Sequence, residues 1–261
     1  MCHPLRVEIS DQLNALQSAG ERLAVAAQSA GLGASVPSCP GWTVRDLLFH
    51  TSAVHRWAAA AVREARLQPP PNVGGDPLRD AEHRPPDDEL VGWFADGHTS
   101  LVKTLRDAPA DVECWSFLTA TSPLSFWVRR QTHETTVHRV DAELAARELT
   151  PIDPAVAVDG IDELLTGFAP LTHWNLHSEQ ARTMSVQTTD VAAAWHLTIG
   201  TEPVVSERVD ENCGADAALR GTATQVYLAL WNRTSFDTPD SAGDAELLGK
   251  WPELLRVRWS R

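Results

Sequence analysis

The chain has 261 residues, of which 43% are hydrophobic, and its 35 acidic and 22 basic side chains give a formal net charge of −13. This length suits two domains or one large one. The acidic balance argues against nucleic acids and anionic membranes as partners, because no basic surplus is available to bind phosphate groups. No apolar run approaches the roughly 18 residues of a membrane-spanning helix, and residues 1–6 lack the apolar core of a signal peptide. We therefore expect a soluble, cytoplasmic protein that is a monomer or a homodimer.

The first half of the chain carries four segments with the apolar periodicity of amphipathic helices. Thr43, with Asp46 three residues later, resembles a capping box and predicts a helix start. The expected helices cover about residues 8–31, 44–67, a segment that opens at 85–89 and runs to about 105, and 124–148. Four helices of this length favour an antiparallel bundle over residues 1–150 with a plausible internal site.

The pattern changes after Pro151. One more helix is expected over 155–168, short alternating segments predict strands at 184–188, 194–199 and 203–209, and residues 215–232 predict a last helix. The expected fold class is therefore α+β, with the four-helix bundle followed by a small α+β domain over residues 151–261.

A polar stripe runs along the predicted fourth helix. Glu134 and His138 are four residues apart, so they project from one face. Arg130 and Asp141 lie near the same face. A solvated outer face of the bundle would give the same pattern, and the spacing leaves both interpretations open. His133 does not join the stripe: it points about 140° away from His138, which excludes the HExxH metalloprotease motif.

A third ligand for a metal ion could come from the predicted second helix, which carries His50 and His55. These two are five residues apart and cannot easily bind one ion together. A lone histidine on an apolar helix face is also more often a core residue than a ligand. With Glu134 and His138, His50 would complete a set of three ligands with an open fourth position, which suits a catalytic rather than a structural divalent metal.

Other candidate sites have weaker support. His173 and His177 have helical spacing but follow a segment rich in helix breakers, so surface histidines are expected there. The four cysteines are scattered, which disfavours a disulfide scaffold or a thiolate zinc site. Cys39 lies near the predicted site, where an ordinary buried or half-buried thiol is expected. Phosphate-binding loops, GxSxG elbows and dinucleotide fingerprints are absent from the sequence.

Several motifs resemble one known family. Residues 38–47 followed by His50, and residues 133–142, resemble the mycothiol-dependent maleylpyruvate isomerase family, whose members are DinB-like four-helix metalloproteins of actinobacteria. Residues 160–165 and 216–233 resemble its C-terminal domain, so the resemblance covers nearly the whole chain. Two positions depart from the family pattern: Asn232 stands where glycine is common, and Val140 where tryptophan is common.

The resemblance implies a divalent metal, usually zinc, bound by His50, Glu134 and His138. It also implies an enzyme that uses mycothiol, a low-molecular-weight thiol, against a small electrophile, either as an isomerase or as a thiol S-transferase. Arg233 is the best match to an arginine that assists the family's isomerase. Asp141 could then orient His138, and Arg130 or Arg233 could hold a substrate carboxylate. The alternative is a non-catalytic, metal-stabilised binding or regulatory module.

Overall fold

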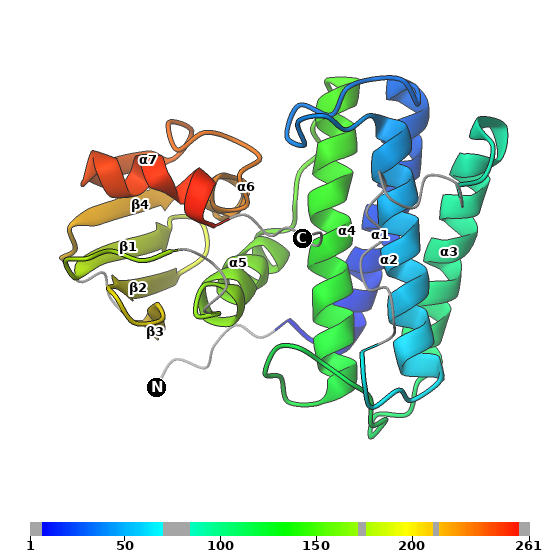
Figure 1. Ribbon diagram of the computed structural model, residues 1–261, viewed down its shortest axis with the longest axis horizontal. Coiled ribbons are helices and arrows are strands. Elements are labelled where there is room, and N and C mark those ends of the chain that lie inside the picture. Colours follow the sequence, from blue (N-terminus) through cyan, green and yellow to red (C-terminus); the bar gives the residue numbers. More distant parts are fainter. Residues whose placement is uncertain (1–6, 70–83, 172–175, 211–213, 256–261) are drawn as a thin grey trace. The chain divides into compact units, whose positions relative to one another are not determined.

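The computed structural model describes residues 7–69, 84–171, 176–210 and 214–255 (Figure 1). Two compact units are present, one of Glu8–Thr150 and one that begins at Pro151. The expected fold class is confirmed, because a four-helix unit precedes a unit in which helices accompany a five-stranded sheet. That residues 1–150 and 151–261 are independent domains stays a prediction. None of the described helices is long and apolar enough to cross a membrane.

The four helices of the first unit begin close to the expected residues. They are α1 (Ile9–Ala30), α2 (Val44–Arg63), α3 (Asp87–Asp107) and α4 (Pro123–Ala146). The largest interfaces in this unit join α1 to α4 and α2 to α3. The capping box expected from Thr43 and Asp46 is present at the start of α2. This helix ends four residues earlier than expected. Ala65 adopts a left-handed backbone conformation, and the backbone N–H of Arg66 donates a hydrogen bond to the carbonyl of Ala61, which terminates the helix.

Helix α4 is the central element of this unit. It starts with Pro123 behind a capping box of Ser122 and Ser125, and every residue from Arg130 to Glu143 is buried. Its ends pack into two hydrophobic clusters: Ala142 joins one of them, and the other, with Leu16 and Leu101, takes in Leu124, Phe126, Trp127 and Val128. The polar part of α4 therefore lies between two apolar cores.

The second unit contains a mixed sheet with strand order β3-β2-β1-β4-β5. Strands β1 and β4 pair in parallel, and the other neighbours are antiparallel. Its elements are α5 (Pro154–Asp162), the π-helix η2 (Glu163–Phe168), β1 (Arg182–Thr188), β2 (Ala193–Ile199), β3 (Val205–Val209), β4 (Ala217–Gly221), α6 (Ala223–Leu230), β5 (Asp240–Gly243) and α7 (Ala245–Leu254).

The prediction of one helix over residues 215–232 is wrong. Residues 217–221 form strand β4, and only residues from Ala223 onward are helical. Ala217, Leu219 and Gly221 are buried while the residues between them are more exposed, which is the period-two pattern of a strand. Thr222 then caps α6 by accepting a hydrogen bond from the backbone N–H of Gln225. Strand β5 and helix α7 were not predicted.

Candidate metal centre

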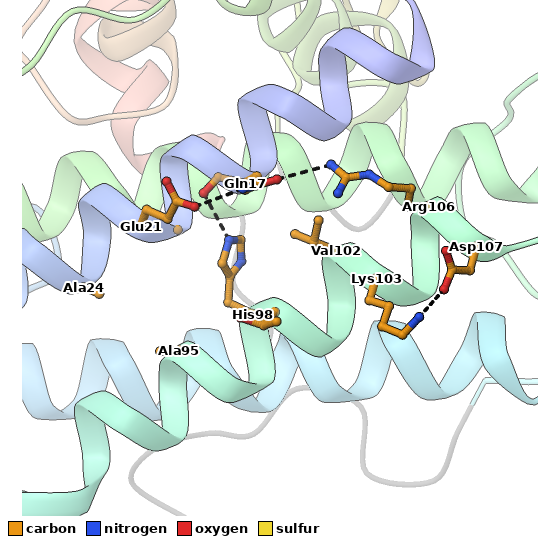
Figure 2. A pocket seen from close by; sticks show the side chains of 11 residues that line it. Gln17, Glu21, Ala24, Ala95, His98, Val102, Lys103, Arg106 and Asp107 are labelled. Carbon is orange, nitrogen blue, oxygen red and sulfur yellow. Dashed lines mark hydrogen bonds and ion pairs between the residues drawn. The ribbon is translucent and has the colours of Figure 1, made fainter.

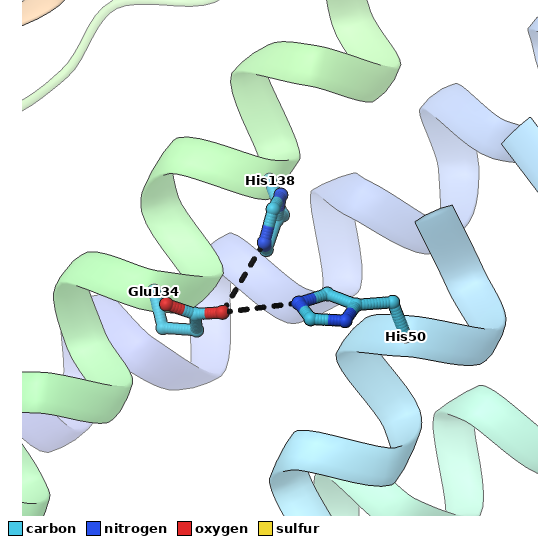
Figure 3. Close-up of side chains that lie close together, drawn as sticks. All are labelled: His50, Glu134 and His138. Carbon is cyan, nitrogen blue, oxygen red and sulfur yellow. Dashed lines mark hydrogen bonds and ion pairs between the residues drawn. The ribbon is translucent and has the colours of Figure 1, made fainter. Parts of the chain in front are cut away.

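Three side chains from two helices meet inside the bundle. His50 extends from α2, and Glu134 and His138 extend from α4 (Figure 3). One carboxylate oxygen, Glu134 Oε1, lies 3.2 Å from His138 Nε2 and 3.5 Å from His50 Nε2. All three residues are buried, and their possible ligand atoms lie within 4.8 Å of one another. The predicted polar stripe is therefore not a solvated outer face.

The spacing of these donors suits a tetrahedral cation. Nitrogen and carboxylate ligands lie about 2.1 Å from zinc, so neighbouring ligands in a tetrahedron are about 3.4 Å apart. The two nitrogen–oxygen distances to Glu134 Oε1 match this value. Two imidazoles and one carboxylate are also a donor set that zinc accepts in catalytic sites. His50, Glu134 and His138 could thus hold a divalent metal without rearrangement of the helices.

Glu134 is held by a third partner. The Nη2 atom of Arg130, one turn earlier on α4, lies 3.2 Å from the second carboxylate oxygen, Glu134 Oε2. Burial by itself would raise the pKa of Glu134, but hydrogen bonds to His138 and His50 and the charges of His138 and Arg130 outweigh it and hold this pKa well below its usual value. Arg130 is only 1% exposed. The described contact places Arg130 on the carboxylate, and its suggested role in binding substrate stays a prediction.

His138 is paired on both of its ring nitrogens. Its Nδ1 lies 2.9 Å from Asp141 Oδ2, and its Nε2 faces Glu134. Burial would lower the pKa of His138, but hydrogen bonds to the carboxylates of Asp141 and Glu134 overcome this effect and raise it to about 9. The Asp141 contact leaves Nε2 as the nitrogen that faces Glu134 and His50.

A loop before α2 also reaches this group. The hydroxyl of Ser38 donates to Asp141 Oδ1 at 2.5 Å, and the thiol of Cys39 lies 3.6 Å from Asp141 Oδ2. The ring of Trp42 meets His50 edge-on, with centroids 5.0 Å apart. Residues 38–47 carried the family resemblance, but the contacts of Ser38 and Trp42 were not foreseen, because nothing in a loop's residue spacing tells which distant helix the loop touches.

The other histidines of the bundle lie elsewhere. His55 is fully buried against the rings of Phe94 and His98, and its Nε2 lies 2.9 Å from Thr135 Oγ1. Burial and the neighbouring His98 lower the pKa of His55 well below its usual value. His133, although buried, is not one of the three candidate metal ligands. Outside the bundle, His177 is exposed, and His173 lies outside the described residues.

His98 borders a hollow of about 460 Å³ between α1 and α3 (Figure 2). Its Nε2 atom lies 3.2 Å from the backbone carbonyl of Gln17 on α1. The ring approaches α1 at Gly20, where an added Cβ would lie 2.3 Å from the imidazole. None of the three candidate metal ligands lines this hollow.

Arg233 belongs to the second unit and lies three residues beyond the end of α6. Its Nη1 donates to the carbonyl of Trp231 at 2.7 Å. The preceding Asn232 has a left-handed backbone with φ of 61°, which explains why glycine is common at this position in the family pattern. The proposed catalytic role of Arg233 stays a prediction.

Comparisons with known proteins agree with this architecture. The family model described as "Mycothiol maleylpyruvate isomerase N-terminal domain" matches residues 13–143, and the MDMPI C-terminal domain model matches residues 155–250. A crystal structure of the mycothiol-dependent maleylpyruvate isomerase aligns with a TM-score of 0.63 and 14% identity, over 92% of this chain and 95% of that one. The crystal structure of a mutant with one histidine changed to alanine gives the same values. No curated protein matches the chain.

Proposed function

The chain belongs to the mycothiol maleylpyruvate isomerase family, and on that premise we propose that it is a metal-dependent enzyme that uses a low-molecular-weight thiol. The thiol we propose is mycothiol, and its partner substrate is a small electrophile. The reaction is either an isomerisation, in which the thiol adds and leaves again, or an S-transfer, in which it stays on the product. The observation that carries this proposal is the buried group of His50, Glu134 and His138, whose donor spacing suits a divalent metal.

We propose that these three residues bind a divalent metal, zinc, and leave one coordination position open. A divalent cation favours the thiolate form of a thiol that binds it, whereas a free thiol with a pKa of about 8.5 is mostly protonated at neutral pH. Two further residues of the chain orient the proposed metal ligands. Arg130 holds one oxygen of Glu134 so that the other faces the two histidines, and Asp141 holds the ring of His138.

We further propose that Arg233 binds or polarises the electrophile. The support is its match to the assisting arginine of the family, together with the left-handed backbone of Asn232 where the family pattern has glycine. A guanidinium suits this task, because it can bind a carboxylate through two parallel hydrogen bonds. Replacement by lysine would keep the charge but lose this geometry.

The test compares the wild type with His138→Ala and with His55→Gln, a buried histidine outside the metal-ligating group. Metal content is measured by elemental analysis, and turnover is followed with maleylpyruvate and other small electrophiles, with and without mycothiol. We expect about one divalent ion per chain and thiol-dependent turnover in the wild type and in His55→Gln, and loss of both in His138→Ala.

The products decide between the two reactions. Mycothiol that is recovered unchanged beside an isomerised product indicates an isomerase, and a stable thioether adduct indicates an S-transferase. A wild type without bound divalent metal contradicts the proposed site. A wild type that binds metal but shows no thiol dependence with any electrophile favours the alternative of a metal-stabilised binding or regulatory module.

A further inference from the structure

Ser38 occupies a well-defined loop rather than an open segment. The loop between α1 and α2 is closed on itself by backbone hydrogen bonds: Val36 N–H donates to Trp42 O at 3.0 Å, and Trp42 N–H donates to Cys39 O at 3.0 Å. A β-bridge joins Ser35 and Thr43 at its base. These contacts hold the loop backbone, and they present the half-buried Ser38 side chain to α4.

The hydroxyl of Ser38 begins a chain of hydrogen bonds that ends at the candidate metal ligands. Ser38 Oγ donates to Asp141 Oδ1 at 2.5 Å, and the other oxygen, Oδ2, lies 2.9 Å from His138 Nδ1. An ionised carboxylate only accepts hydrogen bonds, so the hydroxyl and the imidazole N–H are both donors. Asp141 is fully buried, which makes each of these bonds important for the orientation of its carboxylate.

The neighbouring thiol does not replace this contact. Cys39 Sγ is 3.6 Å from Oδ2, the oxygen that also faces His138, and a thiol is a weak donor. Ser38 contacts the opposite oxygen, Oδ1. The serine and the histidine therefore hold the two ends of one carboxylate, and rotation of that carboxylate would break both contacts.

We propose that Ser38 is a positioning residue of the metal centre: it fixes the carboxylate of Asp141, which in turn holds His138 with Nε2 directed at the metal position. This inference rests on the proposed function, because it assigns Ser38 a role in metal binding. Partners that orient a ligating histidine typically change metal affinity 10- to 100-fold when they are removed. A loop residue 103 positions away from Asp141 thereby sets the affinity of a site formed by two helices.

The experiment measures zinc affinity by competition with a chelator in the full-length wild type, Ser38→Ala, Ser38→Thr and Ser35→Ala. We expect Ser38→Ala to bind zinc about 10- to 100-fold more weakly. Ser38→Thr keeps the hydroxyl and stays within about threefold of the wild type. Ser35→Ala, an exposed position in the same loop, leaves the affinity unchanged.

A second readout separates positioning from general loss of structure. In the metal-free protein, solvent exchange of the His138 Nδ1 proton, followed by NMR, becomes faster in Ser38→Ala and returns to the wild-type rate in Ser38→Thr. In an Asp141→Asn background, Ser38→Ala changes zinc affinity less than about twofold, because the residue through which Ser38 acts is already altered. If Ser38→Ala does not fold, Ser38→Cys, which keeps a weaker donor, is measured in its place.

The outcomes distinguish this inference from the proposed function. If the wild type binds zinc and Ser38→Ala binds it equally well, the positioning role is wrong while the metal centre stands. An equal effect of Ser38→Ala with and without the carboxylate of Asp141 also overturns the role. If the wild type binds no zinc, the proposed function and this inference fail together.

Discussion

The four-helix unit buries its histidines in two contrasting environments. His138 lies between the carboxylates of Glu134 and Asp141, which raise its pKa to about 9 despite burial. His55 is also buried but faces Phe94, His98 and the hydroxyl of Thr135, and its pKa is lowered well below the usual value. Both are on helices of the same bundle. The difference teaches that burial does not make a histidine a candidate ligand; a carboxylate beside a ring nitrogen, as at His138 and His50, does.

The surroundings of the two histidines also differ in whether they need a compensating charge. Neutral His55 packs with aromatic rings and needs no counter-charge. The group around the three candidate metal ligands instead gathers two carboxylates and Arg130 in the interior, where unpaired charges are costly. In the metal-free protein a proton on His138 partly balances these charges, and a divalent cation would take over that task.

The largest effect is expected from the carboxylate that both ligand histidines share. Glu134→Gln keeps the shape but removes the charge, so we expect zinc affinity to fall on the order of 1,000-fold or more. His55→Gln, the matched change in the other environment, should leave zinc affinity within about twofold. Both are measured by chelator competition and elemental analysis. Equal losses in the two variants would show that general core integrity, not the carboxylate, determines binding.

Arg130→Met tests whether the buried guanidinium supports Glu134 or binds the substrate. Because Arg130 pairs with Glu134 Oε2, we expect zinc affinity to fall about 10- to 100-fold. Arg63→Met, on the exposed surface of α2, serves as the control. If zinc affinity is unchanged and only the KM for a carboxylate-bearing substrate rises, Arg130 binds substrate and does not support the ligand.

The pH dependence of zinc affinity and of protein stability should also distinguish His138 from His55. Zinc must displace the proton of His138, whose pKa is about 9, so we expect zinc affinity to rise about tenfold per pH unit from about pH 7 and to level off near 9. The sign is opposite for the stability of the metal-free protein. A raised pKa contributes stability that is complete below about pH 6.5, the unfolded value, and is lost as the pH rises through about 9.

Two titrations check this prediction. Zinc affinity is determined at several pH values with a calibrated chelator, and the unfolding of the metal-free protein is followed over the same range. Between about pH 7 and 9, His55→Gln should show the wild-type profile in both, because the lowered pKa of His55 keeps this residue neutral over that range. A zinc affinity that does not change between about pH 7 and 9 contradicts the assignment of a bound proton to His138.

The smallest effect is expected from the packing around His55 and its neighbour His98. Gly20→Ala would place a Cβ 2.3 Å from the His98 ring, which is held by Gln17 and packed against Phe94. Overpacking costs about 1–3 kcal/mol, and the better helix propensity of alanine returns somewhat less than 1 kcal/mol, so we expect a net loss of up to about 2 kcal/mol. Denaturant unfolding measures it.

Gly92→Ala on α3 is the matched control, because nothing lies within 4 Å of its added Cβ. This change should stabilise the protein by about 0.5–1 kcal/mol through helix propensity alone. Zinc affinity should stay unchanged in both glycine variants. A large loss of zinc affinity in Gly20→Ala would mean that the two histidine environments are coupled.

Local sequence patterns predicted much of this protein. Helical spacing placed Glu134 and His138 on one face, and the capping residues Thr43 and Asp46 marked the start of α2 correctly. The resemblance of the two motifs to a known family indicated His50 as the third member of the group, whereas spacing alone left His50 and His55 open. These features depend on residues near one another in the chain, where periodicity and capping chemistry act.

Long-range pairing decided the rest. Residues 217–221 contain alanine and leucine that suit a helix, yet they form β4 because β1 offers a parallel partner. Likewise, periodicity gives the angle of Arg130 around its helix but not whether that face meets solvent or the interior. The contact of Ser38 with Asp141 joins residues 103 positions apart. Only the packed bundle brings these groups together, because the neighbours of a side chain across an interface are set by tertiary contacts, and those contacts determine its burial, charge and hydrogen bonds.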